Sequence, residues 1–179
     1  MGTDALDLTT LSIGLLLARV VIGLLMAAHG AQKLVGWFGG YGLKVTGEFM
    51  VQLGFERGRA FATAASVGEI ASGLLIALGF LGPVGPAIMV SIMIVAAVTV
   101  HWEHGLFAQK NGIELPLLYG TAGVGLAMTS FGRYSLDAWL GIAGHWPSAF
   151  TWVALALGIV GGIGNLALRR RPATTPVRS

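Results

Sequence analysis

One apolar stretch near the N-terminus limits the folds that this chain can adopt. Residues 11–28 read LSIGLLLARVVIGLLMAA, and Arg19 is the only charged residue among them. Eighteen residues is close to the minimum length of a helix that crosses the hydrocarbon core of a bilayer. Four further apolar runs follow, and together the five take up most of the 179 residues. The sequence therefore predicts an all-α, polytopic membrane helix bundle with the lipid bilayer as its surroundings.

The composition agrees with lipid as the solvent. Charged residues make up only 11% of the chain, against about 25% in a typical soluble domain. The net charge of +3 does not indicate a nucleic-acid partner, because the basic residues lie between the apolar runs and at the C-terminus, where membrane topology explains them. The absence of cysteine excludes disulfides, thiolate metal sites and thiol redox chemistry in this chain.

The apolar runs place five membrane spans along the chain. The first begins with N-cap chemistry at residues 7–10 and is expected to be retained, because no basic residue precedes it as in a signal peptide. Residues 30–58 form a linker that we expect to carry a short interfacial helix capped by Thr46. Residues 169–179 are expected to be a basic, disordered tail. The spans are predicted at about 10–29, 60–81, 86–101, 115–131 and 147–168.

Lysine and arginine are distributed unevenly between the two sides that five spans would define. One side holds only Arg133, while the other holds nine basic residues, including the run 169–171. The positive-inside rule then places the N-terminus outside and the C-terminus in the cytoplasm. We therefore expect a multi-pass protein of the cytoplasmic (inner) membrane.

Two isolated charges lie inside the first two spans. Arg19 precedes His29 by ten residues, and Glu69 follows Arg59 by ten. If both spans start from the same linker, both charges lie about 15 Å from that membrane face. This depth predicts a buried Arg19–Glu69 ion pair, which either locks the two helices together or lines a ligand cavity.

A second group of polar residues lies where the spans meet the linker side. His29, Gln32, Lys33 and His101 are candidates for ligand binding at this boundary, together with the buried pair. His101, Glu103 and His104 form a weak candidate for a metal site, although two histidines at the end of a span are more often interfacial caps. Aromatic residues here either form an interfacial belt or stack on a ring-bearing ligand such as a quinone.

These motifs resemble a known family. The first span, LLLARVVIGLLMAAHG, is followed by His-Gly-x-x-Lys, by a helix ending FMVQLGF, and by a span in which Glu69 precedes GLLIALGF. This order of motifs, over roughly residues 11–140, is similar to the DoxX family of small integral membrane proteins. The resemblance implies a four-helix core (residues 1–146 here), association with redox systems, and motif residues Arg19, His29, Lys33 and Glu69.

Two functions follow from these observations. One is a redox-associated subunit that binds a quinone or similar small ligand, with no haem or nucleotide site evident. The other is a non-catalytic accessory subunit that packs against a larger membrane complex through the additional helix at 147–168, whose glycines favour close packing. A transporter is less well supported, because the chain shows no clear inverted repeat.

Overall fold

The computed structural model describes residues 4–170, and this part of the chain is all-α. The predicted tail after residue 170 lies outside the described residues. Seven α-helices are α1 (Asp4–Val35), α2 (Gly42–Gln52), α3 (Gly58–Leu78), α4 (Val84–Ala96), α5 (Glu114–Thr129), α6 (Leu136–Trp139) and α7 (Ser148–Ala167). Five shorter segments are η1 (Trp37–Gly39), η2 (Ala97–His101), η3 (Trp102–His104), η4 (Ala108–Lys110) and η5 (Ala143–His145).

Four helical segments are long and apolar enough to cross a membrane. They are Leu8–Val35, Gly58–Leu78, Val84–His104 and Ser148–Ala167. The predicted spans at 10–29, 60–81, 86–101 and 147–168 correspond to these segments. The predicted fourth span corresponds to α5, which has only 16 residues and is shorter than the four candidate spans.

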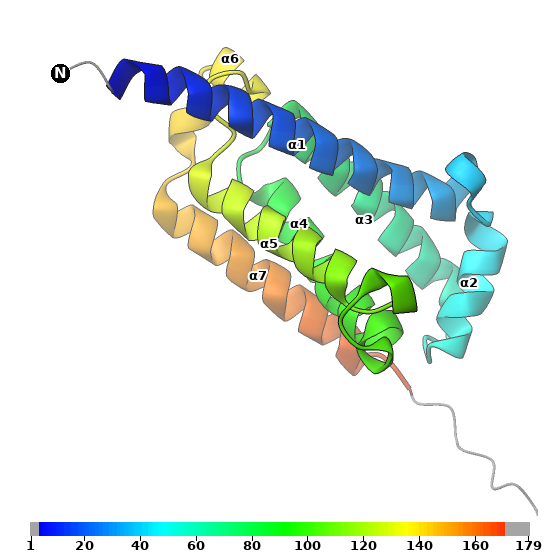
Figure 1. Cartoon of the computed structure of the whole chain (residues 1–179). Coiled ribbons are helices and arrows are strands. Elements are labelled where there is room, and N and C mark those ends of the chain that lie inside the picture. Colours follow the sequence, from blue (N-terminus) through cyan, green and yellow to red (C-terminus); the bar gives the residue numbers. More distant parts are fainter. Residues whose placement is uncertain (1–3, 171–179) are drawn as a thin grey trace, which may run out of the picture.

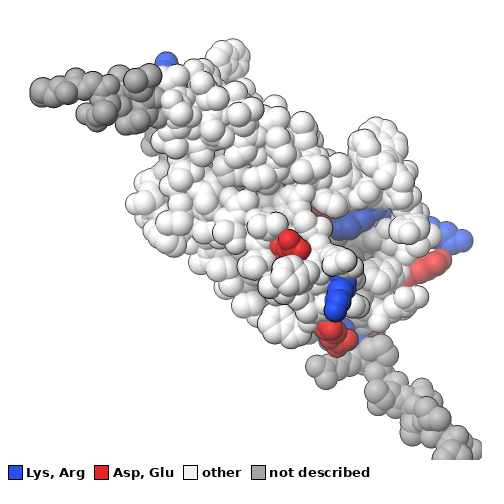
Figure 2. Space-filling model, in the orientation of Figure 1, with Lys and Arg blue, Asp and Glu red and all other residues white. Residues whose placement is uncertain are grey.

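The long helices run back and forth between two ends of one bundle (Figure 1). One end holds the N-terminus, the α3–α4 turn and α6. The other end holds α2, the α4–α5 connection and the C-terminal end of α7. Charged residues gather at this second end, whereas the middle of the visible surface carries almost none (Figure 2). The face shown in Figure 2 is therefore apolar in its middle and strongly polar at one end, as expected for a membrane protein.

Small residues set the approach of α1 to α3. A Cβ atom added to Gly23 would overlap the backbone at Gly73 and Ala77, and one added to Gly73 would overlap the backbone of α1. A Cβ atom added to Gly30 would likewise overlap Ser66 and Ile70, which lie nearer the start of α3. These contacts fix how the two antiparallel helices are aligned, because neither can slide without a clash.

Glycines of α7 make a similar contact inside the chain. Gly158 packs on the backbone of Ala87, and Gly162 packs on Ser91 and Ile94, all of them in α4. The expectation that this glycine face is available for another protein is therefore wrong for these two positions. Within α7 only Gly164 faces open space.

Two predicted helix ends differ from the structure. Helix α1 runs from Asp4 to Val35, so it starts before the predicted cap and continues six residues beyond His29. Thr46 lies inside α2 instead of capping it. Its hydroxyl donates to the carbonyls of Gly42 (2.9 Å) and Lys33 (3.3 Å), and thereby ties α2 to the end of α1.

Candidate functional site

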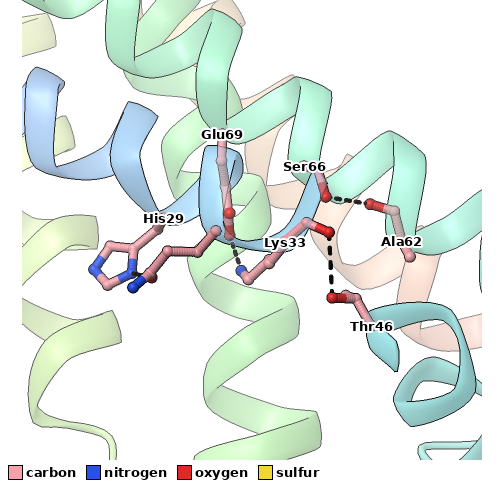
Figure 3. A network of polar contacts seen from close by, with 7 residues as sticks. His29, Lys33, Thr46, Ala62, Ser66 and Glu69 are labelled. Atoms are coloured by element: carbon pink, nitrogen blue, oxygen red, sulfur yellow. Dashed lines mark hydrogen bonds and ion pairs between the residues drawn. The ribbon is translucent and has the colours of Figure 1, made fainter. Parts of the chain in front are cut away.

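Glu69 is the most deeply buried charged residue of the described chain, with 1% of its surface exposed. Its Oε1 accepts a hydrogen bond from the ammonium group of Lys33, and the two side chains form an ion pair. Figure 3 shows Lys33 of α1 reaching across to Glu69 of α3. The predicted Arg19–Glu69 pair is therefore wrong: Glu69 is paired, but with the lysine of the same motif.

Arg19 lies elsewhere and bonds to backbone. Its guanidinium donates to the carbonyl of Ala77 and to that of Tyr134 (2.6 Å). Ala77 is in the last turn of α3, where carbonyls lack helical partners and where a cation is favoured by the helix dipole. Arg19 is 2% exposed, and it ties α1 to the end of α3 and to the loop before α6.

The alignment of α1 on α3 explains why the prediction failed. The predicted pairing requires His29 to lie opposite Arg59, because the first span was expected to end at His29. In the structure the neighbouring Gly30 packs on Ser66 and Ile70, so Glu69 lies near the level of His29. Arg19 precedes His29 by ten residues of α1, which corresponds to about 15 Å. Arg19 is therefore too far from Glu69 to form an ion pair.

A cavity of about 280 Å³ lies beside the Lys33–Glu69 pair. Its walls come from α1, α2, α3, η2 with the adjoining part of α4, and α7. Ten of the seventeen lining residues are apolar, and a mainly apolar lining with some polar groups is typical of a site for a small organic ligand. The polar lining residues are Lys33, Thr46, Glu69, Ser91, Thr99, His101 and Asn165, and the aromatic ones are Phe49, Phe55 and Phe61.

One oxygen of Glu69 has no partner. Its Oε2 is buried and accepts no hydrogen bond, whereas Oε1 is bound to Lys33. An unpaired buried acceptor costs about 1–3 kcal/mol relative to a satisfied one. The cavity is thus lined by a carboxylate that still has hydrogen-bonding capacity for a ligand.

The wall contributed by η2 is a π-helix. Residues 97–101 adopt this wider helix at the end of α4, and Thr99, Val100 and His101 line the cavity. Such short π-helical segments are rare and are frequent at functional sites. The π-helix of this chain thus coincides with one wall of the cavity.

The cavity opens at the side of the bundle. Ala64 of α3, Phe49 of α2 and Asn165 of α7 line it and are themselves exposed. Ala64 is six residues from the start of α3, and Asn165 is two residues from the end of α7. The mouth therefore lies between these helices, close to the polar end of the bundle, whereas the lining residue Glu69 is buried.

The structure separates the six predicted ligand-binding residues into two groups. Lys33, Glu69 and His101 line the cavity, whereas Arg19, His29 and Gln32 do not. His29 donates to the Gln32 side chain (3.2 Å), and Gln32 donates to the carbonyl of Phe38 (3.1 Å). This chain of hydrogen bonds supports the turn after α1.

The weak metal candidate receives no support from the geometry. His101 Nδ1 donates to the carbonyl of Asn111 (2.7 Å), and His104 Nδ1 donates to that of Val100 (3.0 Å). Among residues 4–170, no three His, Asp or Glu side chains lie close enough to hold a metal ion. Both histidines act as caps of the local loop.

Sequence reasoning missed the role of Asp137. This residue is 3% exposed, and its carboxylate accepts from the amides of Leu81 (2.9 Å) and Gly82 (2.7 Å) and from Trp146 Nε1 (2.8 Å). It holds the α3–α4 turn, in which Leu81 and Gly82 both have positive φ. Only the turn sequence GPVGP after Leu81 indicated that this loop needs support.

Comparisons with known proteins identify a family over the first half of the chain. Residues 14–102 match the model of the DoxX family, so the chain carries a DoxX family domain in this range. The match begins within α1 and ends at the first residue of η3, before α5, so it is shorter than the resemblance over residues 11–140 implied. Neither curated proteins nor solved structures give a match.

Proposed function

We propose that this DoxX-family membrane protein is a redox-associated subunit that binds a small amphiphilic ligand of the quinone type in the cavity beside Lys33 and Glu69. The observation that carries the proposal is the cavity itself, because its largely apolar lining includes the ion pair between Lys33 and the buried Glu69. The pair replaces the Arg–Glu pair as the polar part of the binding site. The redox association rests on the family resemblance.

The position of the mouth supports a ligand that partitions into lipid. Ala64 and Asn165 lie near the ends of their helices at the polar end of the bundle, where the hydrocarbon region meets the headgroups. An amphiphile enters from this level without leaving the bilayer, and its polar head then reaches Glu69. The cavity of about 280 Å³ exceeds the roughly 150 Å³ that accommodates benzene in an engineered protein cavity.

Binding of decylubiquinone to the protein in lipid nanodiscs tests the proposal. Ala64→Phe adds a ring at the mouth and is expected to weaken binding at least tenfold. Val67→Phe is the matched control, because Val67 is an exposed residue of the same helix and does not line the cavity. Equal affinity for wild type and Ala64→Phe, or no saturable binding by wild type, would contradict the proposal.

The accessory-subunit alternative predicts a different result. Mass spectrometry of the protein purified from native membranes in mild detergent identifies the proteins and small molecules that accompany it. A stoichiometric quinone that is lost in Ala64→Phe supports ligand binding. A tight protein partner without a small molecule, lost only when residues 147–168 are removed, would support the accessory role. The internal packing of Gly158 and Gly162 weighs against that role.

We further propose that the chain crosses the inner membrane five times, with the N-terminus outside. Helix α5 is about 24 Å long at 1.5 Å per residue, so its crossing requires local thinning of the bilayer or loop residues at its ends. The cysteine-free sequence allows a direct test. A membrane-impermeant thiol reagent should label Gly144→Cys in intact spheroplasts, and Gln109→Cys only after permeabilisation. Labelling of both from one side would contradict five crossings.

A further inference from the structure

The hydrogen bonds that the Glu69 carboxylate makes and lacks restrict the head group that this cavity accepts. Oε1 is occupied by Lys33, and Oε2 is buried without a partner. A carboxylate oxygen accepts hydrogen bonds and donates none. Only a ligand that brings an O–H or N–H group removes the unpaired acceptor, whereas a ligand with carbonyl or ether oxygens alone leaves it in place.

Lys33 adds the complementary requirement. Its ammonium group has three N–H donors, of which one is directed to Glu69 Oε1. The side chain is 35% exposed and lines the cavity, so it retains donors for a ligand. A single hydroxyl satisfies both residues, because its proton binds Glu69 Oε2 while its oxygen accepts from Lys33. A quinone carbonyl satisfies Lys33 alone.

The rest of the lining fixes the body of the ligand. Phe55 is 1% exposed and stacks near Phe61, with ring centroids 4.7 Å apart. Both rings line the cavity together with Ile92, Val95 and Ala96. These walls favour a ring or alkyl body, and they offer no anionic group other than Glu69 among the lining residues.

We propose that the site selects the hydroxyl-bearing, reduced form of its amphiphilic ligand: a hydroquinone or alkylphenol head, with its O–H donated to Glu69 Oε2 and its oxygen bound to Lys33. This inference rests on the proposed function, because it concerns the same cavity. It adds that the two redox forms of one quinone bind unequally, and that Glu69 is the residue that distinguishes them. The proposal concerns binding alone and includes no electron transfer.

Four probes, measured in nanodiscs under anaerobic conditions, test the inference. They are decylubiquinol, decylubiquinone and a redox-inert pair made of 4-decylphenol and its methyl ether. An unpaired buried acceptor corresponds to a factor of about ten to a hundred in affinity. We expect the quinol to bind more tightly than the quinone by this factor, and the phenol more tightly than its ether.

Glu69→Gln is the decisive variant. Its side-chain amide turns a donor toward the position of the lost acceptor, so the preference for the quinol should fall to about one or reverse toward the quinone. Glu56→Gln is the matched control, because Glu56 is an exposed carboxylate outside the cavity, and it should retain the preference. The methyl ether pair separates hydrogen-bond donation from redox chemistry.

The outcomes distinguish this inference from the proposed function. If all probes bind with equal affinity and Ala64→Phe abolishes that binding, the cavity is a ligand site but the selectivity for a donor is overturned. If wild type prefers the quinol and Glu69→Gln keeps the same preference, the assignment to Glu69 is overturned. If no probe binds, the proposed function itself fails.

Discussion

The two ends of the bundle bury charged side chains in opposite ways. Near α6, Arg19 and Asp137 are bound mainly by the backbone of neighbouring turns. Near α2, Glu69 is paired with one side chain and keeps one oxygen unpaired beside a cavity. The first arrangement holds connecting loops in place, and the second leaves binding capacity unused.

The presence of a cavity alone does not distinguish the two ends of the bundle. A cavity of about 170 Å³ also lies beside Asp137, between the α3–α4 turn and Trp146. Both oxygens of Asp137 already accept hydrogen bonds there. Arg19 Nε has no partner, but Arg19 does not line that cavity. Glu69 differs in both respects, because it lines the larger cavity and one of its oxygens has no hydrogen-bond partner.

The largest expected effect on stability is at the end of the bundle near α6. Arg19→Ala removes two hydrogen bonds from a charged donor and leaves two carbonyls unpaired, which should cost about 3 kcal/mol or more. Thermal unfolding in detergent, followed by circular dichroism, measures the loss. Arg133→Ala is the control, because Arg133 is exposed and only stacks on Tyr134. Equal unfolding temperatures of the two variants would show that the hydrogen bonds of Arg19 do not stabilise the bundle.

Asp137→Asn should have the next largest effect. An amide nitrogen in place of one carboxylate oxygen directs a donor at another donor, so the α3–α4 turn should lose about 2 kcal/mol. Faster hydrogen exchange at the amides of Leu81 and Gly82 reports the loosened turn directly. The exposed Glu48→Gln should change neither amide. Unchanged exchange in Asp137→Asn would mean that the turn holds itself.

The Lys33–Glu69 pair should show strong coupling. Lys33→Met leaves the carboxylate buried without a counter-ion, and Glu69→Gln leaves the ammonium without its acceptor. Each single change should cost about 1–3 kcal/mol of unfolding free energy, and the double variant should cost less than the sum. Additive losses in this double-mutant cycle would indicate that the pair contributes little to stability and serves binding alone.

The smallest effect is expected at the exposed end of α7. Arg170 forms an ion pair with Glu56 (2.9 Å), and both side chains are mostly exposed, at 76% and 66%. Arg170→Ala should therefore change the unfolding free energy by less than about 1 kcal/mol and should leave ligand affinity unchanged. A loss of unfolding free energy or ligand affinity as large as that of Lys33→Met would contradict this expectation. It would show that the contact between Arg170 and the turn before α3 supports the cavity.

The sequence by itself determined which segments form the bundle and how they alternate. Apolar runs of about 20 residues specify helices without any tertiary information, because a single segment satisfies its own backbone hydrogen bonds in lipid only as a helix. The sequence also placed Lys33 and His101 at one membrane boundary, whereas it placed Glu69 about 15 Å deeper, opposite Arg19. The order of motifs around Arg19 and Glu69 predicted the family, which the match over residues 14–102 confirms.

Only the tertiary structure decided which charges meet. The level at which α1 crosses α3 depends on close contacts at Gly23, Gly30 and Gly73, and a shift of ten residues separates one charge pairing from another. The pattern of apolar residues does not fix that shift, because lipid is as apolar as the helix surfaces and close packing of small residues decides the contact. The cavity likewise depends on residues distant in sequence, from Lys33 to Asn165, which the packing of α4 against both α3 and α7 brings together.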